Sequence, residues 1–159
     1  MKIAYCWFLL ICSIVFSSCD ILINDTNHSE KIVCIGTYTE NGIEKDSVFF
    51  DESDIKWFDT TSHQLKFKER LELNDVRFFR KFNFYAGTDS LFTASLALDI
   101  MSSIVDDLVL RYGSYDGNIY LEDSYPDWIN DSITVVNNQK RAANWNRFID
   151  RLDKVNKIK

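Results

Sequence analysis

The sequence predicts an α+β domain, in which a β-rich antiparallel sheet or barrel-like body is covered by a C-terminal amphipathic helix. Between residues 31 and 136 the chain either alternates apolar and polar side chains or is rich in β-branched and aromatic residues, which is typical of strands. Residues 138–156 instead repeat apolar side chains at intervals of three and four, which is typical of a helix. With 159 residues, the chain is long enough for one domain with a substantial hydrophobic core.

The first strands are predicted from composition and from the turns between them. Residues 32–39 and 43–50 are rich in β-branched and aromatic side chains. Asn41-Gly42 lies between them and is typical of a tight hairpin turn, because both residues tolerate a positive φ. A third short strand is expected at 55–58, after an acidic break.

The later strands are predicted mainly from alternation, because a strand with one buried face places every second side chain in the core. Residues 65–73 and 92–100 show this pattern, and the aromatic-rich segment 78–85 ends at a glycine-containing turn. Residues 100–106 fit either a strand or a short helical turn. The expected total is six to eight strands, of which the later ones are 65–73, 78–85, 92–100, 108–112 and 119–121.

The C-terminal segment changes from a period of two to a period of three to four. Its apolar residues define one face of a helix of about five turns, from about 138 to 156, with Asn137 or Asn138 as the N-cap. The apolar face comprises Ala142, Trp145, Phe148, Ile149, Leu152 and Val155.

Charge is distributed unevenly along the chain. The formal net charge is −6, yet residues 137–159 hold seven basic and two acidic side chains. An acidic protein is poorly suited to nucleic acid, since phosphate binding needs clustered Lys and Arg, and we expect no nucleic-acid partner. The basic C-terminal segment is either a solvated helix face or a polybasic surface for anionic lipid or glycan.

The N-terminus has the layout of a secretory signal peptide. Lys2 is followed by an apolar run from Ile3 to Phe16, and the small residues Ser17 and Ser18 come next. A helix needs about 20 residues to cross the hydrocarbon core of a bilayer, so this run of fourteen is short for a permanent span.

The end of this segment, Val15-Phe16-Ser17-Ser18-Cys19, resembles the lipobox of bacterial lipoproteins, and Ser-Ser-Cys-Asp resembles lipoproteins of the Bacteroidetes group. The family implies cleavage between Ser18 and Cys19, a lipid on the Cys19 thiol, and anchoring to a membrane of the cell envelope, at the outer membrane, cell surface or periplasmic side. Phe16 departs from the leucine that is usual three residues before the cysteine. An ordinary secretory signal and an uncleaved anchor are the alternatives.

Lipidation would divide the chain into three parts: a signal peptide (1–18), a tether (19–30) and a single β-rich domain (31–159). Cys34 is then the one cysteine left for the domain. It lies in an apolar stretch, so we expect a buried thiol rather than a nucleophile.

No short motif of the chain carries a known catalytic chemistry. His-Glu-x-x-His, Cys-x-x-Cys and Gly-x-Ser-x-Gly patterns are all missing, so we assign no catalytic residue, no cofactor and no metal centre. Polar side chains gather between residues 106 and 127, either as turn and surface residues, as calcium ligands, or as the carboxylates of a small hydrolase acting on an envelope or extracellular glycan. This acidic cluster comprises Asp106, Asp107, Asp116, Asn118, Glu122, Asp123 and Asp127.

Three aromatic residues near predicted strand ends, Trp57, Tyr125 and Trp128, are candidate binding residues. Exposed aromatic rings stack on sugars or anchor protein partners, although aromatic residues of strands also build cores. The sequence therefore favours a non-catalytic, lipid-anchored binding module whose partner is a glycan or another envelope protein.

Overall fold

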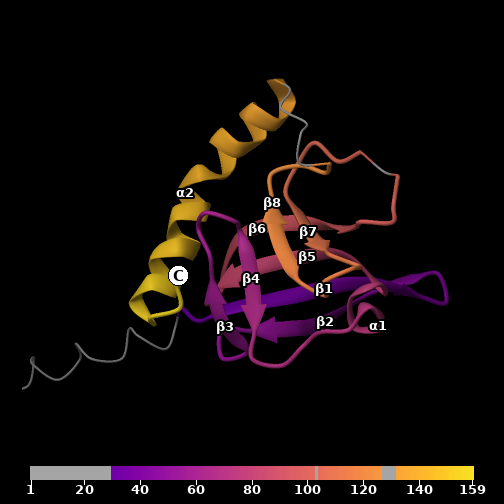
Figure 1. Ribbon diagram of the computed structural model, residues 1–159, viewed down its shortest axis with the longest axis horizontal. Helices are drawn as coiled ribbons and strands as arrows, with labels where there is room; N and C mark the ends of the chain where they lie inside the picture. Colours follow the sequence, from indigo (N-terminus) through magenta and orange to yellow (C-terminus); the bar gives the residue numbers. More distant parts are fainter. Residues whose placement is uncertain (1–29, 103, 127–131) are drawn as a thin grey trace, which may run out of the picture.

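The computed structural model describes residues 30–102, 104–126 and 132–159 (Figure 1). The predicted signal peptide, its predicted cleavage site at Ser18 and Cys19, nearly all of the predicted tether, and Trp128 lie outside the described residues. The described elements are β1 (Ile32–Glu40), β2 (Ile43–Asp51), β3 (Ile55–Phe58), β4 (Gln64–Phe67), α1 (Leu73–Val76), β5 (Phe79–Ala86), β6 (Asp89–Leu98), β7 (Val109–Tyr112), β8 (Ile119–Glu122) and α2 (Ser132–Lys154).

The strands form one mixed sheet in the order β2-β1-β5-β6-β7-β8-β4-β3. This sheet and its C-terminal helix confirm the predicted α+β class. The prediction of a purely antiparallel sheet is corrected at one point, because β6 and β7 run parallel, with Ser95 opposite Val109. A tight hairpin cannot join parallel strands, and residues 99–108 make this connection instead.

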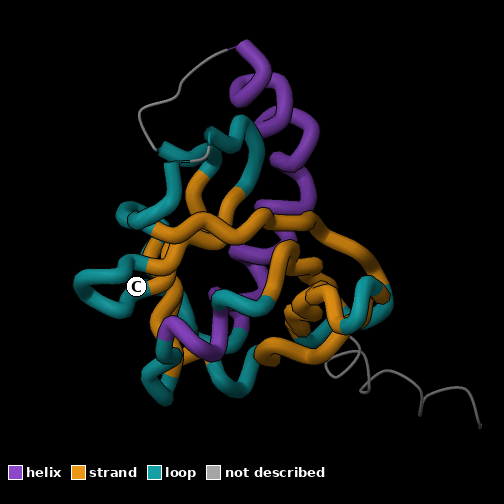
Figure 2. The backbone as a smooth tube through the Cα atoms, turned by 90° about the vertical axis from the view of Figure 1, so that its right-hand side faces the viewer, coloured by secondary structure: helices purple, strands orange, loops and turns teal. Residues whose placement is uncertain are grey.

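The sheet is strongly curled. Its edge strands are β2 and β3, yet only three residues, Glu52 to Asp54, join them. Four Cα–Cα steps span at most about 15 Å, whereas the edges of a flat eight-stranded sheet lie about 34 Å apart. The strands therefore curve round into a half-barrel (Figure 2), and the ring centroids of Phe50 in β2 and Phe67 in β4 approach to 4.8 Å.

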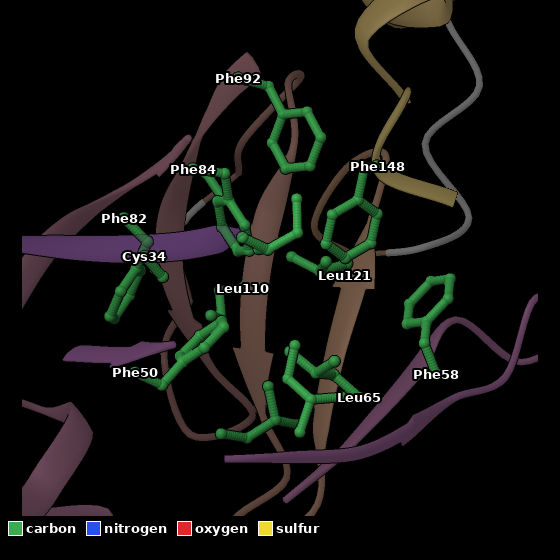
Figure 3. Close-up of a cluster of buried hydrophobic side chains, with 14 of the residues drawn as sticks. Cys34, Phe50, Phe58, Leu65, Phe82, Phe84, Phe92, Leu110, Leu121 and Phe148 are labelled. Carbon is green, nitrogen blue, oxygen red and sulfur yellow. The ribbon is translucent and has the colours of Figure 1, made fainter. Parts of the chain in front are cut away.

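One hydrophobic core fills the concave side of the sheet, and α2 packs against it (Figure 3). Phe148 of α2 is fully buried, and its ring centroid lies 5.5 to 5.9 Å from those of Phe58, Phe84 and Phe92. Among the described residues, those of the core run from Ile32 to Ile158.

The start of α2 corrects the predicted N-cap. Asn137 and Asn138 are inside the helix, which is already formed at Ser132. Asn137 uses its side-chain amide to donate to the carbonyl oxygen of Asp106 at 3.1 Å. The first turns carry β-branched residues without a clear apolar face, so periodicity marked only the later turns, where Phe148 is buried.

The alternating segment 65–73 is a strand only as far as Phe67. Its pattern is broken by Glu69 on the apolar face, and the chain turns into the short helix α1. Glu72 and Asp75 form a capping box there, in which the Asp75 carboxylate accepts from the backbone N–H of Glu72 at 2.8 Å. The capping box thus favours a helical turn here, where the alternating pattern predicted a strand.

The predicted Asn41-Gly42 hairpin turn is confirmed, with φ angles of 53° and 78°. At the other end of β2, a buried ion pair ties the β2–β3 corner to α2. Arg151 donates through Nε and Nη2 to the two carboxylate oxygens of Glu52, at 2.7 and 2.9 Å. Each side chain is only 10% exposed.

The stability of the β2–β3 corner should depend on pH. Hydrogen bonds from Lys31 and Ser53 lower the pKa of Asp51 to about 2 from an ordinary value of 3.8. A depressed pKa stabilises the folded state above the unfolded-state value, and that contribution is lost as the pH falls from about 4 towards 2. In urea titrations, we expect Asp51→Asn to cost about 1 kcal/mol at neutral pH. The difference in unfolding free energy between the variant and the wild type should close as the pH falls from 4 to 2. A difference that stays constant over this range would contradict an origin in the Asp51 charge.

Candidate functional site

A polar hollow of about 250 Å³ opens on the convex side of the sheet. Strand alternation explains its position: Leu110 and Leu121 point into the core, so their neighbours Arg111 and Glu122 face outward. We call this feature the Arg111 hollow. It is lined by Asp99, Arg111, Glu122, Tyr125 and Pro126.

Arg111 organises the hollow. It donates through Nε and Nη2 to both carboxylate oxygens of Glu122, at 2.8 and 2.7 Å. Its Nη1 donates to Asp99 at 3.0 Å, and its guanidinium carbon lies 4.2 Å from the ring centroid of Tyr120. These partners come from β8 and from the residue that follows β6, because Arg111 on β7 lies opposite Tyr120 on β8 and Ala97 on β6.

The hollow holds one guanidinium and two carboxylates, which gives it a formal charge of −1. Burial alone would lower the pKa of Arg111, but its hydrogen bonds to Glu122 and Asp99 outweigh burial and raise that pKa. The guanidinium therefore stays charged and holds two carboxylates in fixed positions. Its side chain is 21% exposed and that of Glu122 is 14% exposed, so the network lies at the surface within reach of a ligand.

Tyr125 forms the rim of the hollow. Its backbone exchanges two hydrogen bonds with Val105, both of 2.8 Å, and its hydroxyl donates to the carbonyl oxygen of Met101 at 3.4 Å. The peptide bond between Tyr125 and Pro126 is cis. These contacts fix the half-buried ring beside the charged network.

The predicted binding aromatics do not form one site. Tyr125 joins the Arg111 hollow, whereas Trp57 lies on the edge strand β3, where the ammonium of Lys159 is 4.6 Å from its ring centroid. Trp128 is among the residues that are not described.

The acidic cluster also separates into different contacts. Asp107 and Asp123 accept from Arg141 of α2 at 2.8 and 2.6 Å. Asp116 instead accepts from the Tyr120 hydroxyl at 3.1 Å. Among the described residues, no group of three or more His, Cys, Asp and Glu side chains is placed to hold a metal ion.

Two further reactive side chains lie in the core or against it. Cys34 is fully buried, which confirms the expected buried thiol, and burial raises its pKa. The ring of His63 stacks on Phe58 with centroids 6.3 Å apart and meets Trp145 edge-on at 5.8 Å. Both groups contribute to packing.

Sequence reasoning missed the centre of the hollow, Asp99 and Arg111. A usable signal existed, because Arg111 is the one charged residue of the apolar strand β7 and Asp99 follows the alternating residues of β6. A charged side chain in a short apolar strand needs a partner on the outer face.

Comparison of the chain with known protein families, with curated proteins and with solved structures finds no match. Within the described part of the chain, no helix is both long and apolar enough to span a bilayer.

Proposed function

We propose that this chain is a lipid-anchored protein of the bacterial cell envelope whose β-rich body binds a saccharide in the Arg111 hollow. The anchoring half is supported by the lipobox-like ending at Cys19. The binding half is supported by the ion-pair network beside Tyr125. Fractionation of a Cys19→Ala variant tests the first half independently of the second.

The chemistry of the hollow favours a hydroxyl-rich ligand. Sugar hydroxyls both donate and accept hydrogen bonds, and the hollow offers carboxylate acceptors from Asp99 and Glu122 beside guanidinium donors from Arg111. An aromatic rim adds an apolar face on which a sugar ring can stack, and Tyr125 supplies that face. A small set of fixed polar groups beside an aromatic ring is typical of a ligand site.

The geometry favours binding over hydrolysis. A glycosidase needs one carboxyl group to protonate the leaving oxygen and a second carboxylate to act on the sugar or on water. In the Arg111 hollow both carboxylates accept from the same guanidinium, and Glu122 uses both oxygens to do so. Each carboxylate oxygen keeps a second lone pair that can accept from a sugar hydroxyl. Neither carboxylate is free of Arg111 to serve as the separate acid or base that hydrolysis needs.

Binding is tested with a panel of neutral and amino-sugar oligosaccharides titrated into the ¹⁵N-labelled chain that starts at Asp20. For a ligand that shifts the signals of the hollow, Tyr125→Ala should weaken binding about tenfold, since an aromatic contact contributes about 0.5–1.5 kcal/mol beyond area. Tyr115→Ala is the matched control, because Tyr115 is 95% exposed in another loop.

Three results would contradict the saccharide proposal. Equal binding by the Tyr125→Ala and wild-type chains would show that the Arg111 hollow is not the binding site. Crosslinking that captures an envelope protein, with no response to any oligosaccharide, would favour a protein partner. Turnover of an oligosaccharide that is abolished by Glu122→Gln would establish the hydrolase alternative.

A further inference from the structure

Lysine side chains surround Trp57 at the edge of the sheet. Lys66 lies opposite Trp57 in the pairing of β3 with β4, and Lys159 lies over the indole ring. The side chain of Lys157 donates to the carbonyl oxygen of Ile55. The register of β3 against β4 shifts between Ile55 and Trp57, and both Ile55 and Phe58 are buried, so Lys56 and Trp57 lie on the same outer side. Lys68 lies near enough to Lys157 to interact with it electrostatically. We call this surface the Trp57 face, and its members are Lys56, Trp57, Lys66, Lys68, Lys157 and Lys159.

The Trp57 face is positive on an otherwise acidic body. Lys56, Lys68 and Lys159 are exposed. Carboxylates also lie near its five lysines: Asp59 is 3.5 Å from Lys159, and Asp51, Glu52 and Asp54 face Lys157. Two of these carboxylates have other cations as partners, since Asp51 pairs with Lys31 and Glu52 with Arg151. The chain as a whole carries −6, so this surface differs in sign from most of the molecule.

The chain enters the fold close to the Trp57 face. The backbone of Ile32, at the start of β1, exchanges hydrogen bonds with Glu52, through the Glu52 N–H at 2.7 Å and the Glu52 carboxylate at 3.3 Å. Glu52 is three residues before the first residue of β3, and its carboxylate binds Arg151 in the last turns of α2. The start of the domain, β3 and the end of α2 therefore lie at one end of the molecule.

The Arg111 hollow lies towards the other end of α2. Asn137 binds the carbonyl of Asp106, which follows Val105, the backbone partner of Tyr125 on the rim. At about 1.5 Å per residue, the fourteen residues from Asn137 to Arg151 separate these contacts by about 21 Å along the helix. Figure 1 shows the same arrangement, with the C-terminal end of α2 beside β3 and its other end beside the loops that follow β6 and β8.

We propose that the Trp57 face docks the body on anionic headgroups of the membrane that holds its lipid. The proposal rests on the proposed anchoring at Cys19. Residues 19–30 span at most about 40 Å, so a lipid on Cys19 keeps this end of the domain near the bilayer. Tryptophan favours the membrane interface, and lysine is attracted to anionic headgroups. Docking through the Trp57 face would turn the Arg111 hollow away from the membrane.

The lipid and the basic face would act as two separate attachment signals. The proposed diacylglyceryl group on Cys19 would hold the chain at the membrane by two acyl chains, and the basic face would add an electrostatic attraction that orients the body. Each lysine near an anionic surface contributes about fivefold in affinity, and added salt screens that attraction. A body without its lipid should therefore retain measurable, salt-sensitive binding to anionic vesicles.

The test uses the unlipidated chain that starts at Asp20, which contains every described core residue, in flotation with two kinds of vesicle. Vesicles of mixed phosphatidylglycerol and phosphatidylcholine should bind the chain, and vesicles of phosphatidylcholine alone should not. The double variant Lys56→Gln/Lys68→Gln should bind about 25-fold more weakly, because two charges are removed. Lys81→Gln/Lys140→Gln removes the same charge from exposed positions outside the Trp57 face and should bind as the wild type does.

A spectroscopic readout places the tryptophan at the membrane. Binding to the anionic vesicles should shift the fluorescence emission to the blue, and Trp57→Phe should abolish the shift while Trp128 and Trp145 still emit. Equal binding by the two double variants, or an unchanged blue shift in Trp57→Phe, would overturn the proposal. Binding to a soluble anionic polysaccharide with no binding to vesicles would overturn it too, in favour of a glycan surface.

The two proposals fail separately. If anionic vesicles bind the unlipidated chain through the Trp57 face but Cys19 carries no lipid in cells, the anchoring alone is refuted. A lipidated Cys19 with no vesicle binding by the body would refute the docking alone.

Discussion

Replacing Cys19 by alanine is expected to abolish lipidation and processing of the full chain in a bacterial host. In the proposed anchoring the Cys19 thiol carries the lipid, and lipoprotein processing cuts in front of the lipid-bearing cysteine. The variant should therefore take up no labelled palmitate and keep residues 1–18, which shows as a heavier chain. The loss should be complete, because each buried methylene of the acyl chains contributes about 0.8 kcal/mol to anchoring and alanine carries none of them.

Two other cysteines provide matched controls for this experiment. Cys12→Ala changes the apolar run of the signal segment, and Cys34→Ala changes the buried thiol of the domain. Both variants should be labelled with palmitate and processed as the wild type is. A Cys19→Ala chain that is labelled, has the mass of the wild-type chain and stays in the membrane fraction would refute the anchoring.

Replacing Arg151 by methionine should destabilise the domain by about 3–5 kcal/mol, because it leaves the Glu52 carboxylate buried without its cation. The pair is bidentate and each side chain is 10% exposed, so little solvent screens the loss. Urea unfolding of the chain from Asp20 measures the free energy. The midpoint of thermal unfolding should fall by about 10 °C or more.

Arg147→Met is the control on the same helix, because its ion pair with Asp89 is exposed and should contribute less than about 1 kcal/mol. The double variant Glu52→Leu/Arg151→Met should recover most of the lost stability, since no unpaired charge is left in the core. Equal effects of Arg151→Met and Arg147→Met would show that the buried pair does not hold the corner to α2.

Local sequence patterns predicted most of the elements. Asn41-Gly42 defined the first hairpin because a two-residue turn needs residues that tolerate a positive φ. Trp145, Phe148 and Leu152 placed the later turns of α2 because one helix face must be apolar to pack on a sheet. Such information lies within a few residues and can be read without the rest of the chain.

Long-range contacts were not predictable in this way. The parallel pairing of β6 with β7 and the curl that brings β2 close to β3 depend on which strands meet, and alternation carries no such information. The Arg111 hollow depends on the same pairing, since Asp99, Arg111 and Glu122 come from three segments of the chain. Tyr125 was selected for its residue type and its place near a predicted strand end, and only the fold placed it beside Arg111.

The most direct test of the account is the mass of the N-terminal tryptic peptide of the protein from bacterial membranes. Trypsin cuts after Lys31, and no Lys or Arg lies between Cys19 and that residue. The account predicts a peptide of residues 19–31 whose Cys19 carries a diacylglyceryl group. An unmodified peptide that begins at Cys19 or at another residue near it, or a peptide that begins at Ile3 and still contains the signal segment, would contradict the account.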